Sequence, residues 1–335
     1  MKKWLLFLLK FALTAACLYW ALNQGELRQK IGRSSNIWPA HPKWEWVGIG
    51  VLFGGVTNFV AALRWWILLQ AQGLKTSLRR VVELTLIGSL FNFATVVGGD
   101  AAKIFLLIRD HPDQKMKVTM TLMIDHLVGL VAMAGTFLLV TAGRFQSIES
   151  HTALEHGALK FAWVYFVGGL VLVGLLFVIA CPAVHDRIHK RHKKMRWDFM
   201  RQIPEIYDVY RRKWGQGLLS LAVGFAMLPV YYATFWCGIK FAGDTAGFTQ
   251  VFSVMPVVDA ISGMPFSIQG IGVREVFLAE LMKDLYGTAA EVSVLGSLVG
   301  FACSLVWAAL GGILFLRPSD RAPMKEIQEA THAEA

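Results

Sequence analysis

Two of the chain's long apolar stretches, at residues 81–108 and 249–282, are interrupted near their centres by glycines that are followed by charged residues. In the apolar interior of a membrane, a single charged side chain costs about 2.5 to 3.5 kcal/mol on insertion scales. Glycine-rich, unwound backbone at that depth is tolerated only where protein or a water-filled cavity satisfies its polar groups. These stretches therefore predict broken helices around a polar site.

The two interruptions also resemble each other. When the two segments are aligned on Gly98 and Gly270, the charged residues Lys103 and Glu275 fall at the same position, and so do Phe105 and Phe277. Such internal similarity is typical of transporters built from two related halves, in which broken helices form the binding site.

Composition excludes an ordinary soluble domain, because 55% of the residues are hydrophobic and the mean hydropathy is +0.50. The chain is predicted to be an all-α polytopic membrane protein. Four cysteines lie singly in or at the ends of apolar segments, without the spacing of a metal site or of a disulfide framework: Cys17, Cys181, Cys237 and Cys303. We interpret them as packing residues and expect no metal and no cofactor.

Six apolar segments are long enough to span a membrane. The first, residues 4–22, lacks a small-x-small cleavage site and contains Lys10, so we interpret it as an uncleaved helix rather than a signal peptide. The other five lie at about 46–69, 118–143, 160–181, 215–240 and 290–316. The two broken regions bring the number of membrane segments to eight.

The loop at 182–214 sets the orientation of these segments. It contains ten Lys or Arg residues against four acids, which predicts a cytoplasmic location by the positive-inside rule. With the N-terminus inside, both broken regions must return to the side from which they start. Otherwise this loop or the C-terminal basic residues would lie outside. Full spanning by 81–108 and 249–282 remains the alternative.

The hairpin interpretation implies one membrane domain, residues 1–316, with two inverted repeats at about 1–143 and 160–316 and a polar tail at 317–335. The hairpins would enter from opposite faces and meet near the midplane. Five residues are candidate hinges: Gly98, Gly99, Pro265, Gly270 and Gly272. Both termini are predicted to be cytoplasmic.

Four motifs occur in an order that is similar to a known family. They are Arg64–Leu69 (RWWILL), Phe91–Asn92 with Gly98–Asp100, Asp125–Leu130 (DHLVGL), and Pro265–Glu275 (PFSIQGIGVRE). Together they resemble the lysylphosphatidylglycerol synthase transmembrane family, which is related to the lipid-translocating half of the bifunctional lysylphosphatidylglycerol synthase/flippase. The resemblance covers about residues 46–316, and its most specific part is 265–275.

This resemblance implies a flippase-like fold and lipid transport. Residues 317–335 are too few for the aminoacyltransferase domain of the bifunctional relatives, so their lipid-aminoacylating activity is not expected. The chain departs from the family pattern at Ala94 and Thr95, where a proline is usual, at Lys103, where Arg is usual, and at Asp125-His126, where Glu-Arg is usual. Loss of the arginine fork weakens the case for bidentate phosphate binding at these positions.

The candidate substrate-binding residues are the polar groups inside the apolar segments. Lys103 and Arg274 are candidates to hold a lipid phosphate, while Asp100 and Glu275 could balance them or bind a cationic head group or a coupling proton. The remaining candidates are Asp125, His126, Asn92, Gln269 and Asp259. Asn92 and Gln269 could instead cap unwound backbone, and Arg64 could simply extend to the membrane surface.

Several functional alternatives stay open. The charged groups could form internal ion pairs, such as Asp100 with Arg274, that only lock the hairpins together. A translocator of phospholipids or lipid-linked intermediates, passive or ion-coupled, is the leading hypothesis. A membrane subunit of a lipid- or glycan-modifying complex and an intramembrane enzyme using Asp125 and His126 are the alternatives, although no known catalytic motif occurs.

The expected partners follow from the leading hypothesis. They are membrane lipids, namely anionic or aminoacylated phospholipids or polyprenyl-linked lipids, with a lipid-synthesis enzyme as a further candidate. The expected location is the bacterial cytoplasmic membrane. Nucleic-acid binding is not expected, because basic residues beside membrane segments mainly set orientation and contact anionic lipids.

Overall fold

The computed structural model describes residues 19, 39, 41–92, 98–142, 153–180, 208–264 and 269–316. Regular structure within these ranges is helical, as predicted. The predicted segment 4–22 apart from Tyr19, the hinge candidate Pro265, most of the basic loop and the tail 317–335 lie outside the described residues.

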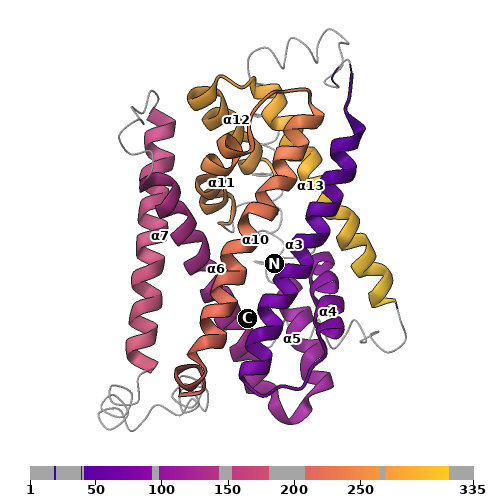
Figure 1. Cartoon of the computed structure of the whole chain (residues 1–335), viewed down its shortest axis with the longest axis vertical. Coiled ribbons are helices and arrows are strands. Elements are labelled where there is room, and N and C mark those ends of the chain that lie inside the picture. The colour runs from indigo at the N-terminus through magenta and orange to yellow at the C-terminus, as the bar shows by residue number, and fades with distance from the viewer. Residues whose placement is uncertain are drawn as a thin grey trace, which may run out of the picture.

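Five long apolar helices confirm five of the six predicted spans (Figure 1). They are α3 (Trp44–Ala71), α6 (Lys115–Ala142), α7 (Ala153–Ala180), α10 (Trp214–Phe241) and α13 (Ala290–Phe315), and each is long and apolar enough to cross a membrane. Cys237 and Cys303 are buried in the apolar interior without a disulfide, as expected for packing residues.

The two broken regions each form a pair of short helices. The first pair is α4 (Leu78–Phe91) and α5 (Gly98–Asp110), and the second is α11 (Phe248–Ser262) and α12 (Val273–Tyr286). In Figure 1 the first pair lies at the lower end of the bundle and the second at the upper end.

Side-chain contacts show that the two helices of each pair run in opposite directions. At the open end of the first pair, Arg80 Nε lies 2.8 Å from Asp110 Oδ2, which joins the start of α4 to the end of α5. In the second pair, the hydroxyls of Ser253 and Tyr286 lie 2.6 Å apart and join the start of α11 to the end of α12. The breaks of both pairs therefore point toward the middle of the molecule.

Helices α3 and α10 form the antiparallel centre on which both pairs rest. The rings of Trp46 and Trp236 meet at 5.0 Å near one end. At the other end, Lys213 Nζ donates to the Ala71 carbonyl at 2.9 Å. Because both helices are mainly apolar, they can bury one face against each other and present the rest to neighbouring helices or lipid.

The helix starts repeat at a regular spacing. Helices α10 and α11 begin 170 residues after α3 and α4 (214 minus 44, and 248 minus 78), while α12 and α13 begin 175 residues after α5 and α6 (273 minus 98, and 290 minus 115). The loops repeat as well: Trp66 Nε1 donates to the Thr76 carbonyl at 2.9 Å, and Trp236 Nε1 donates to the Ala246 carbonyl at 3.0 Å.

The helix starts also give the helix position of the acid that follows each break. Because α5 begins at Gly98 and α12 at Val273, Asp100 and Glu275 are each the third residue of their helix. Asp100 and Glu275 thus hold the same position in their helices, whereas the alignment on glycines pairs Lys103 with Glu275.

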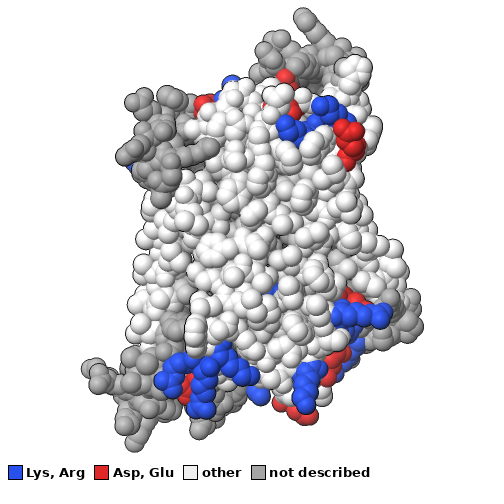
Figure 2. All heavy atoms as spheres, in the orientation of Figure 1, with Lys and Arg blue, Asp and Glu red and all other residues white. Residues whose placement is uncertain are grey.

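Charged side chains gather at the two ends of the molecule (Figure 2). The face shown has blue and red residues along its upper and lower edges and, between them, a broad band in which almost no charged atoms are visible. The described basic residues at the lower end come from the start of α4, the end of α5, the start of α6 and the segment before α10: Arg79, Arg80, Arg109, Lys115, Lys117, Arg211, Arg212 and Lys213. This pattern is typical of a membrane-spanning bundle.

Close helix contact at Gly311 leads to a stability prediction. A Cβ at this position of α13 would overlap the Leu86 carbonyl of α4. We expect Gly311→Ala to lower the free energy of unfolding by about 1 to 3 kcal/mol, because α13 must move away from α4. Thermal unfolding in detergent measures this, and Gly174→Ala is the control because nothing lies within 4 Å of its Cβ. Equal stability of the two variants would contradict the contact.

Candidate functional site

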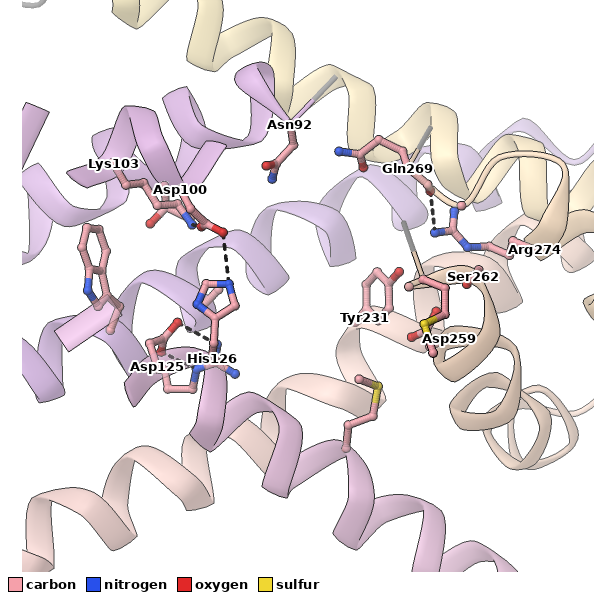
Figure 3. A pocket seen from close by; sticks show the side chains of 18 residues that line it. Asn92, Asp100, Lys103, Asp125, His126, Tyr231, Asp259, Ser262, Gln269 and Arg274 are labelled. Carbon is pink, nitrogen blue, oxygen red and sulfur yellow. Dashed lines mark hydrogen bonds and ion pairs between the residues drawn. The ribbon is translucent and has the colours of Figure 1, made fainter. Parts of the chain in front are cut away.

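A cavity of about 460 Å³ lies where the breaks of the two helix pairs face each other. Figure 3 shows residues of the first half on one side of it, residues of the second half on the other, and Asn92 and Gln269 between them. The charged residues of its lining are Arg64, Asp100, Lys103, Asp125, His126, Asp259 and Arg274. Counting His126 as neutral, three cations face three carboxylates.

Asn92 and Gly99 fix the break between α4 and α5. The side-chain oxygen of Asn92 accepts a hydrogen bond from the Gly99 backbone N–H at 3.1 Å, which satisfies one of the free donors at the start of α5. A Cβ on Gly99 would overlap this oxygen and the Gly88 carbonyl. Of the two roles considered for Asn92, capping is therefore observed, although Asn92 also lines the cavity.

Asp100, in the first turn of α5, contacts both Lys103 and His126. Its Oδ2 lies 3.1 Å from His126 Nε2, and its Oδ1 lies 3.7 Å from Lys103 Nζ. The other ring nitrogen of His126, Nδ1, lies 2.9 Å from the Leu122 carbonyl. Among the described residues, Asp100 thus pairs with Lys103 and His126 rather than with Arg274.

Arg64 and Asp125 form a buried, two-pronged ion pair. Arg64 Nε and one terminal nitrogen donate to the two oxygens of Asp125 at 2.8 and 2.9 Å, and both residues are less than 9% exposed. Arg64 therefore does not extend to the membrane surface. Gly129 leaves space for its guanidinium, because a Cβ there would lie 3.1 Å from the nearer terminal nitrogen.

Arg274 is the principal cation on the opposite side of the cavity. It is 8% exposed, its guanidinium carbon lies 5.0 Å from the centre of the Phe235 ring, and one terminal nitrogen donates to the Gln269 carbonyl at 3.1 Å. Its buried Nε has no hydrogen-bond partner within the part of the chain that the structure describes. A buried donor without a partner is costly, and an incoming acceptor would relieve that cost.

The first half carries a matching cation and aromatic ring. Lys103 Nζ lies 5.9 Å from the centre of the Trp65 ring. Trp65 and Phe235 occupy corresponding places on α3 and α10, because the two helices begin 170 residues apart. Each half thus holds one cation near an aromatic ring, within the range of cation–π attraction.

The turn before α12 places Arg274 by means of unusual backbone angles. Gln269, Gly270 and Gly272 have φ values of 56°, 76° and 84°. Only glycine adopts such angles without strain, so Gly270 and Gly272 suit this turn, whereas Gln269 is strained. The Gly270 carbonyl then accepts from the Arg274 backbone N–H at 2.9 Å and closes the first turn.

Glu275 is the one predicted charged site residue that the structure does not bring into the cavity. It is fully buried, with Oε2 accepting from the Gly272 backbone N–H at 2.5 Å and Oε1 accepting from Ser297 Oγ at 2.6 Å. This arrangement caps the start of α12 and joins it to α13. Neighbouring residues of a helix point in different directions, so only one of Arg274 and Glu275 can face the cavity. The sequence does not show which one, because that depends on how α12 is rotated about its axis.

The remaining predicted residues surround the cavity. Asp259 on α11 and Gln269 both line it, and Asp259 is only partly buried. Three further lining residues were not predicted as site residues: Trp65, which was noted only as part of the RWWILL motif, Tyr231 and Ser262. Arg64 could have been found, because a charged residue 20 places into an apolar helix of 28 residues needs a partner.

The fold and the cavity define a class of protein: a multi-pass α-helical membrane protein with a charged internal site between two broken helix pairs. The sequence supplies a family within this class. It matches the lysylphosphatidylglycerol synthase TM region over residues 7–312, nearly the whole chain, so the chain belongs to that family. The family is associated with lipid translocation. Comparisons with curated proteins and with solved structures gave no significant match.

Proposed function

We propose that this protein moves phospholipids or lipid-linked intermediates between the two leaflets of a membrane. The observation that carries this proposal is the cavity of about 460 Å³, which is lined by seven Asp, His, Lys and Arg side chains inside a mainly apolar helical bundle. Ionisable groups at membrane depth generally mark a path for polar or charged cargo. A lipid head group is such a cargo, and its acyl chains can remain in the bilayer.

The cations of the cavity that can still donate hydrogen bonds to a ligand suggest how a head group binds. Arg64 and Asp125 satisfy each other, so they form the rigid wall of the site. Among the described residues, Arg274 has an Nε–H without a hydrogen-bond partner, and Lys103 is held by a long contact of 3.7 Å to Asp100 and by the Trp65 ring at 5.9 Å. These two cations bind the phosphate of an anionic or aminoacylated phospholipid or of a polyprenyl-linked lipid.

The two helix pairs act as re-entrant hairpins in inverted repeats. Support comes from the 170- and 175-residue spacing of the helix starts and from the antiparallel course of α3 and α10. The lower end in Figure 2 is the cytoplasmic end, because the basic residues beside α4, α5, α6 and α10 gather there. In this arrangement the hairpin α4–α5 enters from the cytoplasm and α11–α12 from the opposite face of the bacterial cytoplasmic membrane.

Reconstitution into vesicles tests the proposal. Vesicles with purified protein should exchange fluorescent phospholipids between leaflets faster than protein-free vesicles, as measured by quenching of the outer leaflet. A panel of anionic, zwitterionic and aminoacylated lipids identifies the preferred head group. Absence of exchange for every lipid, together with stable co-purification of a lipid-modifying enzyme, would instead support a structural subunit. Chemical conversion of the lipid would support an enzyme.

A further inference from the structure

We propose that Asp100 and His126 form a proton-binding site whose occupancy is coupled to binding of an anionic head group. This inference rests on the proposed function, because it concerns the same cavity. It adds the identity of the coupling ion, a proton, and the direction of coupling, in which a proton and a phosphate bind together.

The hydrogen bonds of His126 show that the pair already shares one proton. Its Nδ1 faces the Leu122 carbonyl at 2.9 Å, and a carbonyl only accepts, so this nitrogen carries a hydrogen. Its Nε2 faces Asp100 Oδ2 at 3.1 Å, so a second hydrogen lies between imidazole and carboxylate. The unit is therefore either imidazolium with carboxylate or imidazole with carboxylic acid, and its two members together carry no net charge.

Charge balance gives the consequence of phosphate binding. Before a phosphate binds, Lys103 and the imidazolium of His126 lie within 3.7 Å of one carboxylate, that of Asp100. A phosphate held by Arg274 and Lys103 draws Lys103 away from Asp100 and places a second anion beside this carboxylate. Like charges at such a distance favour protonation of the carboxylate. Uptake of one proton by Asp100 restores the charge that the cluster had before binding.

The other titratable groups around the cavity lie on α3, α6, α10, α11 and α12. Arg64 on α3 is fully engaged by Asp125 on α6, so neither changes partner when a head group enters. Across the cavity lie Tyr231 on α10, Asp259 on α11 and Arg274 on α12. Helix α7, which also packs against α6, contributes no described residue to the lining.

Glu275 provides a comparison within the same molecule. It holds the corresponding place on α12, but both of its oxygens accept hydrogen bonds from neutral donors and the side chain is fully buried. If an acid at the third helix position served only to cap the helix, Asp100 would be expected to be enclosed in the same way. Instead its side chain is 26% exposed in the cavity and faces a histidine that is 58% exposed. The acid at the third helix position is therefore accessible to a proton from the cavity in α5, whereas in α12 it is enclosed.

Proton uptake during binding tests this proposal directly. Purified protein in weakly buffered detergent near neutral pH is titrated with dihexanoyl phosphatidylglycerol. Bound lipid is measured by calorimetry, and proton uptake is measured with a pH-sensitive dye. We expect about one proton taken up per bound lipid, because one carboxylate loses a cationic partner and gains a neighbouring anion. In the variant Asp100→Asn, proton uptake per bound lipid should fall close to zero. The matched control is Asp113→Asn, which replaces an exposed surface acid, and its proton uptake should remain near one per bound lipid.

The outcomes separate this inference from the proposed function. Saturable binding without proton uptake, or equal uptake by Asp100→Asn and the unmodified protein, would overturn the coupling while leaving lipid transport intact. No binding would contradict the proposed function and the coupling with it. In vesicles that exchange lipid, a gradient of one pH unit should shift the distribution of an anionic lipid between leaflets by up to about tenfold for one coupled proton. An unchanged distribution would also overturn the coupling.

Discussion

Replacement of Arg64 with alanine is expected to lower the free energy of unfolding by about 3 to 5 kcal/mol, because it leaves the Asp125 carboxylate buried without its partner. The pair spans α3 and α6, and its two hydrogen bonds of 2.8 and 2.9 Å are the strongest polar link seen between these helices. Chemical or thermal unfolding in detergent measures the loss. The same cost is expected for Asp125→Ala, which leaves the guanidinium unpaired.

Two controls separate this effect from general damage. Arg79→Ala removes a cation that is 83% exposed and paired with Glu83 at 3.3 Å, so its cost should be about 1 kcal/mol or less. The double variant Arg64→Met with Asp125→Leu replaces the ion pair with apolar groups of similar size and should recover most of the lost stability. An Arg64→Ala protein as stable as Arg79→Ala would show that the pair is unimportant for the fold.

Replacement of Arg274 with alanine is expected to reduce exchange of an anionic lipid about 10- to 100-fold at low lipid concentration. A hydrogen bond to a charged group contributes about 1.5 to 3 kcal/mol, and Arg274 has a buried Nε–H available for the phosphate. Arg274→Lys keeps the charge but not the fork, so an intermediate rate is expected. Initial rates of leaflet exchange in vesicles measure both effects.

Stability must be checked for the same variants, since Arg274 also contacts Phe235 and the Gln269 carbonyl. Its removal should lower the unfolding midpoint less than Arg64→Ala does, because no buried carboxylate is hydrogen-bonded to it in the described structure. Arg79→Ala serves again as the control and should exchange lipid at the unmodified rate. Normal exchange by a folded Arg274→Ala protein would remove Arg274 from the proposed path.

The spanning helices could be predicted from the sequence because each is a continuous apolar run of sufficient length. The spans predicted at 215–240 and 290–316 correspond to the helices at 214–241 and 290–315. The breaks were also found, since glycine next to charge is rare within apolar segments. The pairing of residues inside the cavity could not be predicted, because it depends on how α3, α5 and α6 rotate about their own axes.

Arg64, Asp100 and Glu275 illustrate this limit. The sequence places all three in apolar segments, yet Arg64 turns inward to Asp125, Asp100 faces the cavity, and Glu275 turns into the contact between α12 and α13. A rotation of about 100° separates consecutive residues on a helix, and it decides whether a charge lines a path or caps a helix. Only the packed structure fixes that rotation.

The central claim is that a lipid head group occupies the cavity between the two helix pairs. A phospholipid with a photoreactive diazirine in its head group tests this most directly, because illumination joins the head group to whatever it touches. After digestion, mass spectrometry should find cross-links to cavity-lining residues of α5, α6, α11 and α12, and excess unlabelled lipid should suppress them. Cross-links confined to outward-facing positions such as Val164 and Leu172 of α7, which are 74% and 54% exposed, would contradict the claim.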